Sequence, residues 1–204
     1  KGYTGIGGGD ETAIYRTVDS GATWQKAMRG LPAENIGRIG MAISPANPDI
    51  VYALVQAKEG SGLYKSTNRG VSWSKQSGYG SAYPFYMQKI YADPKDENKI
   101  YSMDLLIQIS KDGGKTFSAL GEKFKHVDNH VLWIDPSNTK HLISGNDGGI
   151  YETWDMGQNW DFKSRMPIAE IYKVSTDNAT PFYNVYIGTQ DNNSLGGPSR
   201  TVNS

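Results

Sequence analysis

Four short segments of this 204-residue chain follow one pattern, and their spacing limits the possible folds more than any other feature. Each begins with Ser or Thr, has Asp or Asn at its third position and Gly at its fifth, and ends on an aromatic residue. The third positions are Asp19, Asn68, Asp112 and Asp155, with spacings of 49, 44 and 43 residues. Strand-like runs lie between the segments. A repeat near 45 residues that carries several such runs is typical of a β-propeller blade.

The residue types in the pattern explain how each segment would turn the chain. An Asp or Asn side chain can accept backbone N–H groups inside a turn, and Gly allows a positive φ. We therefore expect Asp19, Asn68, Asp112 and Asp155 to be structural, on turns between the third and fourth strands of each blade. The closing aromatic residues should be buried between blades. They are Trp24, Trp73, Phe117 and Trp160.

Composition excludes several kinds of protein. The 21 basic and 21 acidic residues cancel, so the sequence shows no electrostatic signature of nucleic-acid binding. The sequence contains no Cys, so disulfides and Cys-ligated zinc are excluded. No apolar run reaches about 18 residues, so we expect no membrane span.

A longer set of motifs gives a more specific resemblance. It comprises His126-Val-Asp-Asn-His130-Val-Leu-Trp-Ile-Asp135-Pro136, then Gly145-Asn-Asp-Gly-Gly-Ile-Tyr151, Gly188-Thr-Gln-Asp-Asn192 and Gly196-Gly-Pro-Ser-Arg200. With the four repeats, these motifs resemble the Asp-box, or BNR-repeat, β-propellers. The likeness is to large bacterial BNR-repeat proteins described as glycosyl-hydrolase-like or as sortilin (VPS10)-like. It covers nearly the whole chain.

The resemblance implies an all-β fold of four-stranded antiparallel blades, of which about four are present as a partial propeller. Full blades are predicted at 30–78, 79–121 and 122–165, with the end of a blade at 1–29 and the start of another at 166–204. Propellers of this kind close with more blades, and open ends would expose unpaired strand edges. We therefore expect the chain to be a fragment whose partners are the remaining blades or domains of a larger, secreted, cell-surface or periplasmic protein.

One blade departs from the repeat in a way that indicates function. Only the predicted blade at 122–165 carries His126, Asp128 and His130 at the start of its innermost strand. Alternation along a strand would place the three side chains on one face. Such a set could act as an acid/base pair with an orienting carboxylate, bind a metal, or simply line the channel mouth. We predict no cofactor and no metal here, with Asp128, His130 and Asp147 as the candidate catalytic residues.

Polar loops at the same end of the predicted blades extend this site. Asn146 and Asp147 follow a second strand, and Gln190 and Asp191 occupy the equivalent place in the next blade. We predict that His126, Asn146, Gln190 and Asp191 bind a ligand. An aromatic stretch, Tyr79-Gly-Ser-Ala-Tyr83-Pro-Phe-Tyr86, enters another blade from the same end. Tyr83 and Tyr86 are predicted to contact a glycan or peptide, and the alternative is packing between blades.

These features support more than one function. The main prediction is a propeller that binds a glycan or peptide at its top face, and the alternative is a glycoside hydrolase of the xyloglucanase type. A glycosidase needs two carboxylates across the scissile bond, and Asp128, Asp147 and Asp191 are candidates. Sialidase activity is disfavoured, because only Arg38 lies near the start of an innermost strand. A purely structural module is a third possibility.

Overall fold

The computed structural model describes residues 8–9, 11–164, 171–189 and 194–200. Every regular element in these ranges is a β-strand, and all sheets are antiparallel, as predicted. The chain divides into two compact units, residues 1–164 and 165–204, and each is described by itself. The described ranges contain no helix long and apolar enough to cross a membrane.

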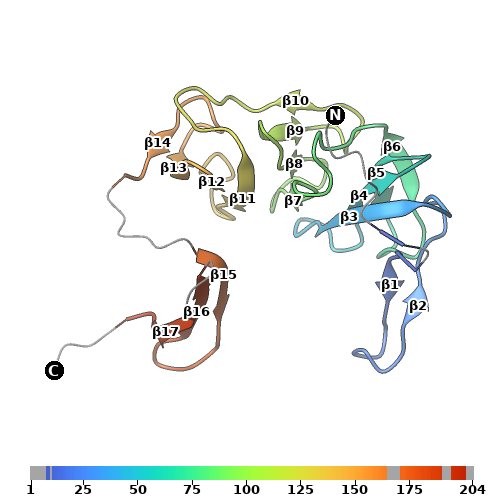
Figure 1. Cartoon of the computed structure of the whole chain (residues 1–204), viewed down its shortest axis with the longest axis horizontal. Coiled ribbons are helices and arrows are strands. Elements are labelled where there is room, and N and C mark those ends of the chain that lie inside the picture. Colours follow the sequence, from blue (N-terminus) through green and yellow to red (C-terminus); the bar gives the residue numbers. More distant parts are fainter. Residues whose placement is uncertain (1–7, 10, 165–170, 190–193, 201–204) are drawn as a thin grey trace. The chain divides into compact units, whose positions relative to one another are not determined.

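The first unit consists of one hairpin and three four-stranded sheets, labelled in Figure 1. The hairpin is β1 (Tyr15–Arg16) and β2 (Gln25–Lys26). The first sheet is β3 (Ile36–Ile43), β4 (Val51–Ala57), β5 (Gly62–Ser66) and β6 (Ser74–Ser77). The second is β7 (Ile90–Ala92), β8 (Ile100–Ser102), β9 (Gln108–Ser110) and β10 (Ser118–Ala119). The third is β11 (Asn129–Ile134), β12 (Leu142–Asn146), β13 (Gly149–Thr153) and β14 (Asp161–Phe162).

Strand order within each sheet follows the chain, so each is a simple meander. The three sheets lie inside the predicted blades 30–78, 79–121 and 122–165, whose boundaries stay a prediction. The second unit has one three-stranded meander, β15 (Ile171–Thr176), β16 (Asn184–Thr189) and β17 (Ser194–Pro198). Short connections between neighbouring antiparallel strands account for this order.

The hydrophobic core of the first unit lies between successive sheets. Tyr52 and Leu54 of β4 pack with Ile100 of β8, which joins the first sheet to the second. Tyr101 of β8 packs with Leu142 of β12, which joins the second sheet to the third. Because each sheet buries one face against each neighbour, its strands carry large apolar side chains on both faces.

The four repeat turns connect the third strand of a sheet to the fourth, and β1 to β2 in the hairpin. Each contains two consecutive residues with positive φ, the second being Gly, as in a type I′ hairpin turn. In the first turn, Asp19 Oδ1 accepts the Thr23 backbone N–H at 2.9 Å and Asp19 Oδ2 accepts the Thr23 hydroxyl at 2.6 Å. These bonds from Thr23 lower the pKa of Asp19 to about 2. Asn68, Asp112 and Asp155 accept equivalent backbone bonds.

Two of the four closing aromatic residues are buried as expected. Trp73 and Trp160 are buried, and their indole N–H groups donate to the carbonyls of Ala27, which follows β2, and Gly121, which follows β10. Phe117 is half-buried and stacks on Tyr79 at 3.8 Å.

Trp24 does not follow this pattern, and the prediction that it is buried is wrong. It is 59% exposed, and its indole N–H donates to the carbonyl of Gly21 in its own turn. Among the described residues no strand precedes β1, so this part of the chain offers no preceding sheet for Trp24 to pack against.

Candidate functional site

The start of β11 and the turn between β12 and β13 bring Asp128, His130 and Asp147 together. Because Asn129 of β11 pairs with Asn146 of antiparallel β12, residues next to both lie at one end of the sheet. His130 Nε2 is 2.7 Å from Asp147 Oδ1 and 3.7 Å from Asp128 Oδ1. The three residues predicted as catalytic thus form one group, here called the acid–imidazole cluster.

Regular strand alternation does not produce this cluster. β11 begins at Asn129, its pairing with β12 is irregular just after that residue, and Asp128 has a φ of 70°. The expectation that His126, Asp128 and His130 share one face of a regular strand is therefore wrong. The Asp128 N–H donates instead to the carbonyl of Leu105, 2.9 Å away in the second sheet. That contact fixes the loop, so the side chains before β11 do not alternate between two faces as they would along a regular strand.

The Asp128 carboxylate has an unusual environment. Its Oδ1 atom is buried and has no hydrogen-bond partner among the described residues. Burial and the nearby Asp147 carboxylate raise the pKa of Asp128, and the charge of His130 opposes that rise. The cluster therefore holds two acidic groups that repel each other around a single imidazole nitrogen.

Exposed aromatic rings lie directly beside the cluster. Residues 79–87, here called the aromatic loop, lie between β6 and β7, and Tyr83, Phe85 and Tyr86 on it are 43–53% exposed. The Tyr86 ring meets the His130 ring edge to face, with centroids 5.4 Å apart. Aromatic side chains from one sheet and polar side chains from the next thus line one surface.

The turn between β8 and β9 holds both parts of this surface. The Asp104 carboxylate accepts the backbone N–H groups of Ala82 and Leu105, both at 2.8 Å, which fixes the aromatic loop. On the other side, the N–H of Asp128 donates to the Leu105 carbonyl at 2.9 Å and the N–H of Asn129 donates to the Asp104 carbonyl at 3.0 Å. Asp104 and Leu105 therefore position the cluster and the aromatic loop together.

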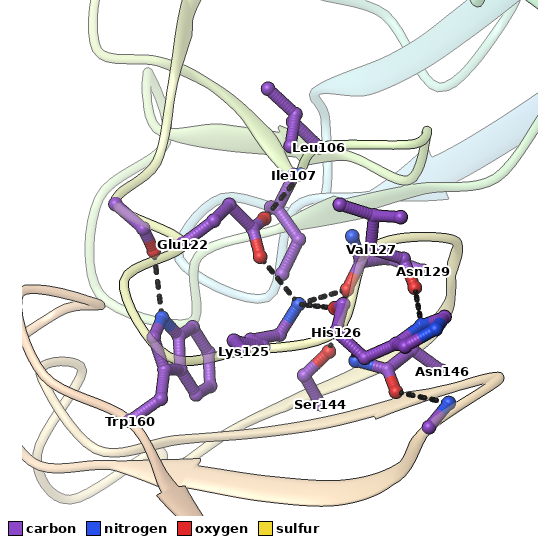
Figure 2. A network of polar contacts seen from close by, with 12 residues as sticks. Leu106, Ile107, Glu122, Lys125, His126, Val127, Asn129, Ser144, Asn146 and Trp160 are labelled. Carbon is purple, nitrogen blue, oxygen red and sulfur yellow. Dashed lines mark hydrogen bonds and ion pairs between the residues drawn. The ribbon is translucent and has the colours of Figure 1, made fainter.

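A buried lysine supports the loop that carries Asp128 (Figure 2). The Lys125 side chain is 0% exposed, and its Nζ lies 2.6 Å from Glu122 Oε2. The same ammonium donates to Asn129 Oδ1 and to the His126 carbonyl. Glu122 also accepts the N–H of Ile107 at 2.7 Å, which ties the network to the second sheet. The ammonium thus replaces its lost water with protein acceptors.

Two aromatic rings complete the surroundings of Lys125. Its Nζ lies 5.2 Å from the centroid of the Trp160 ring and 6.0 Å from that of Tyr151. Burial lowers the pKa of Lys125, and Glu122 counteracts that effect. Sequence analysis did not identify Lys125 or Glu122, because a single Lys in a polar loop gives no sign of being buried.

The remaining predicted ligand-binding residues occupy different places. His126 is exposed, and its Nδ1 lies 2.6 Å from the carbonyl of Val127. Asn146 donates from Nδ2 to the His126 carbonyl at 2.8 Å, so it braces the loop (Figure 2). Gln190 and Asp191 lie outside the described residues.

The chain is similar in sequence to curated xyloglucanases. No family model matches it. It is 34% identical over 195 residues to a xyloglucanase of Hypocrea jecorina and 26% identical over 220 residues to xyloglucanase Xgh74A of Acetivibrio thermocellus. Each alignment covers 88% of this chain but only 21% and 25% of those proteins. The chain thus spans about a quarter or less of the curated relatives it matches.

Solved structures show the same fold. The GH74 xyloglucanase of Xanthomonas campestris superimposes with a TM-score of 0.58 at 16% identity, over 93% of this chain and 32% of that one. YCF48 bound to D1 peptide gives 0.55 at 18% identity, over 86% of this chain and 56% of that one. At this identity the likeness establishes the fold alone. The chain is all-β and forms part of a β-propeller.

Proposed function

We propose that this chain is the ligand-binding part of a larger exported β-propeller protein and that it binds a polysaccharide. The observation that carries the proposal is the edge-to-face contact between Tyr86 and His130, 5.4 Å apart, which joins exposed rings to a polar cluster. The resemblance to BNR-repeat proteins supports a location outside the cytoplasm, which fractionation of producing cells tests.

A sugar ring has apolar C–H faces and a rim of hydroxyl groups, so it needs both kinds of partner. Tyr83 and Tyr86 offer amphipathic rings that stay rigid when a ligand covers them. Asp147, half-exposed, offers a carboxylate that accepts hydroxyl donors in charge-assisted hydrogen bonds. The similarity to xyloglucanases makes xyloglucan the first polysaccharide to test.

A second candidate is glycoside hydrolysis, which the similarity to xyloglucanases favours. Glycosidases place two carboxyl groups about 5–9.5 Å apart with the sugar between them. In the acid–imidazole cluster one oxygen of each carboxylate and His130 Nε2 all lie within 4.8 Å of one another. The imidazole occupies the space between the acids. We therefore expect a hydrolase built on this chain to take only one of its two acids from the cluster.

The binding proposal is tested on the full-length protein by titrating xyloglucan, mixed-linkage β-glucan and cellulose oligosaccharides in a calorimeter. Tyr86→Ala should weaken binding of the preferred glycan about tenfold, which corresponds to about 1.4 kcal/mol. Trp24→Ala is the matched control, because Trp24 is an equally exposed aromatic residue on a repeat turn. Equal losses for both variants, or no binding of any glycan, would overturn the proposal.

The same samples separate binding from hydrolysis. If the protein releases reducing sugars from xyloglucan, Asp147→Asn and Asp128→Asn are assayed for rate and for affinity separately. Loss of rate with unchanged affinity favours the hydrolase candidate, and loss of affinity at unchanged rate per bound substrate favours the binding role. If the protein binds an extended peptide and none of the glycans, the ligand class is a peptide and not a polysaccharide.

A further inference from the structure

Two histidines of the third sheet each contact two carboxylates, but in different ways. His141 Nδ1 lies 3.0 Å from Asp135 Oδ2, and His141 Nε2 lies 2.9 Å from Glu152 Oε1. Each ring nitrogen of His141 therefore contacts one carboxylate, and the protonated ring can donate a hydrogen bond to each of them. In the acid–imidazole cluster both carboxylates face the same nitrogen, Nε2 of His130.

This difference has a chemical consequence. One ring nitrogen carries at most one proton and so donates one good hydrogen bond. At His130 the 2.7 Å contact to Asp147 uses that capacity, and Asp128 Oδ1 is left buried with no hydrogen-bond partner among the described residues. A buried carboxylate oxygen without a partner is costly, because it has lost its water. A cation at the centre would satisfy all three groups at once.

We infer that Asp128, His130 and Asp147 bind a divalent first-row transition-metal ion. The three donor atoms all lie within 4.8 Å of one another. Ligands of one ion with bonds of about 2.1 Å lie roughly 3–4.2 Å apart, so small side-chain adjustments bring this set to that geometry. This inference replaces the prediction, made from the sequence, that the cluster holds no metal.

The donor set selects the class of metal. An imidazole nitrogen with two carboxylate oxygens suits manganese, iron or zinc, whereas calcium and magnesium take oxygen ligands almost alone. Asp147 is 53% exposed, so one side of the cluster is open to water. Coordination positions on that side remain available to water or to a further ligand with hydroxyl groups.

Calorimetric titration of the chelator-treated full-length protein with Mn²⁺ and with Zn²⁺ tests this inference, and Co²⁺ absorption spectra report on the ligands. We expect one binding event that Asp128→Asn, His130→Gln and Asp147→Asn each weaken at least tenfold. His141→Gln is the matched control, because it removes a histidine that also lies between two carboxylates, and it should keep the affinity within about twofold. Thermal unfolding verifies that each variant is folded. Asp147→Asn is the variant least able to disturb folding, since its side chain is half-exposed.

Two outcomes would overturn the inference: no metal binding above that of the His130→Gln protein, or an equal loss in the His141→Gln control. Metal binding is measured without glycan, so it can fail or succeed independently of the proposed function. Glycan titrations with and without chelator then separate the two proposals. Glycan binding that survives the chelator while metal titrations show no site would leave the polysaccharide proposal standing alone.

Discussion

Trp154 stacks face to face on His141, with ring centroids 3.6 Å apart and the planes within 5° of parallel. The imidazole has little exposed surface, and Asp135 and Glu152 contact its two nitrogens. Lys163 lies 2.5 Å from Glu152 and extends the ion-pair network. Burial alone would lower the pKa of His141, but the two carboxylates outweigh it and the pKa is raised. The two carboxylates therefore favour the charged form of the ring.

Stability should depend on pH through His141. A group whose pKa is raised on folding adds stability that is fully present below its unfolded pKa of about 6.5 and is lost as pH rises through its folded pKa. Wild-type protein should lose melting temperature between pH 6 and pH 9 relative to His141→Gln. Thermal melts of both proteins across that range measure the difference. Parallel curves for the two proteins would contradict the assignment.

Removing the buried lysine should destabilise the protein strongly. Lys125→Met leaves the largely buried Glu122 carboxylate without its cation, and breaking a buried ion pair in this way costs about 3–5 kcal/mol. Chemical denaturation measures the free energy of unfolding. Lys123→Met changes an exposed lysine two residues away and should alter stability by less than about 0.5 kcal/mol. The double change Lys125→Met with Glu122→Gln should recover part of the loss, and no recovery would count against the charge-pair explanation.

The buried and exposed tryptophans should differ in the same experiment. Trp160 is 7% exposed and packs between the second and third sheets, so Trp160→Ala should cost about 3–5 kcal/mol. Trp24 lies on an equivalent turn but is exposed, and Trp24→Ala should cost less than about 1 kcal/mol. Urea titrations of both variants give the comparison. Similar losses of stability in the two variants would show that the exposure of Trp24 does not determine how much its side chain contributes to stability.

Asp104 should act as a positioning residue for the aromatic loop. Asp104→Ala removes the acceptor of the Ala82 N–H, so that amide should exchange with solvent at least tenfold faster. Asp104→Asn keeps one side-chain oxygen and should give an intermediate rate. Hydrogen exchange resolved by mass spectrometry measures the loop directly, without reference to any ligand. Unchanged protection at residues 79–87 in the Ala variant would show that the loop is held by other contacts.

The repeat predicted much of the fold because its physics is local. Residues such as Asp112 and Gly114 act within their own turn. The repeat pattern therefore predicted the turn, its place between the third and fourth strands, and the meander order. The burial of Trp24 could not be predicted in this way. It depends on whether another sheet precedes the hairpin, which the segment around Trp24 does not encode.

The sequence predicted which residues form the candidate site better than it predicted how they are arranged. Asp128, His130 and Asp147 come together because β11 and β12 are antiparallel, which the repeat implied. The positive φ of Asp128 arises from a hydrogen bond to Leu105 in another sheet, which no local pattern reveals. The role of Lys125 could not be predicted from a local pattern either, because its burial depends on Glu122 and on aromatic rings of the third sheet.

The turn at Asp104 and Leu105 gives the surface a mechanical property. Its carbonyls are bonded to residues 128 and 129 of the third sheet, while its carboxylate holds the loop that enters the second sheet. A pull that separates the two sheets would have to break the hydrogen bonds to residues 128 and 129 and the apolar contacts between the sheets. The acid–imidazole cluster and the aromatic loop would then part while each stayed attached to its own sheet, so this surface exists only while the second and third sheets are packed together.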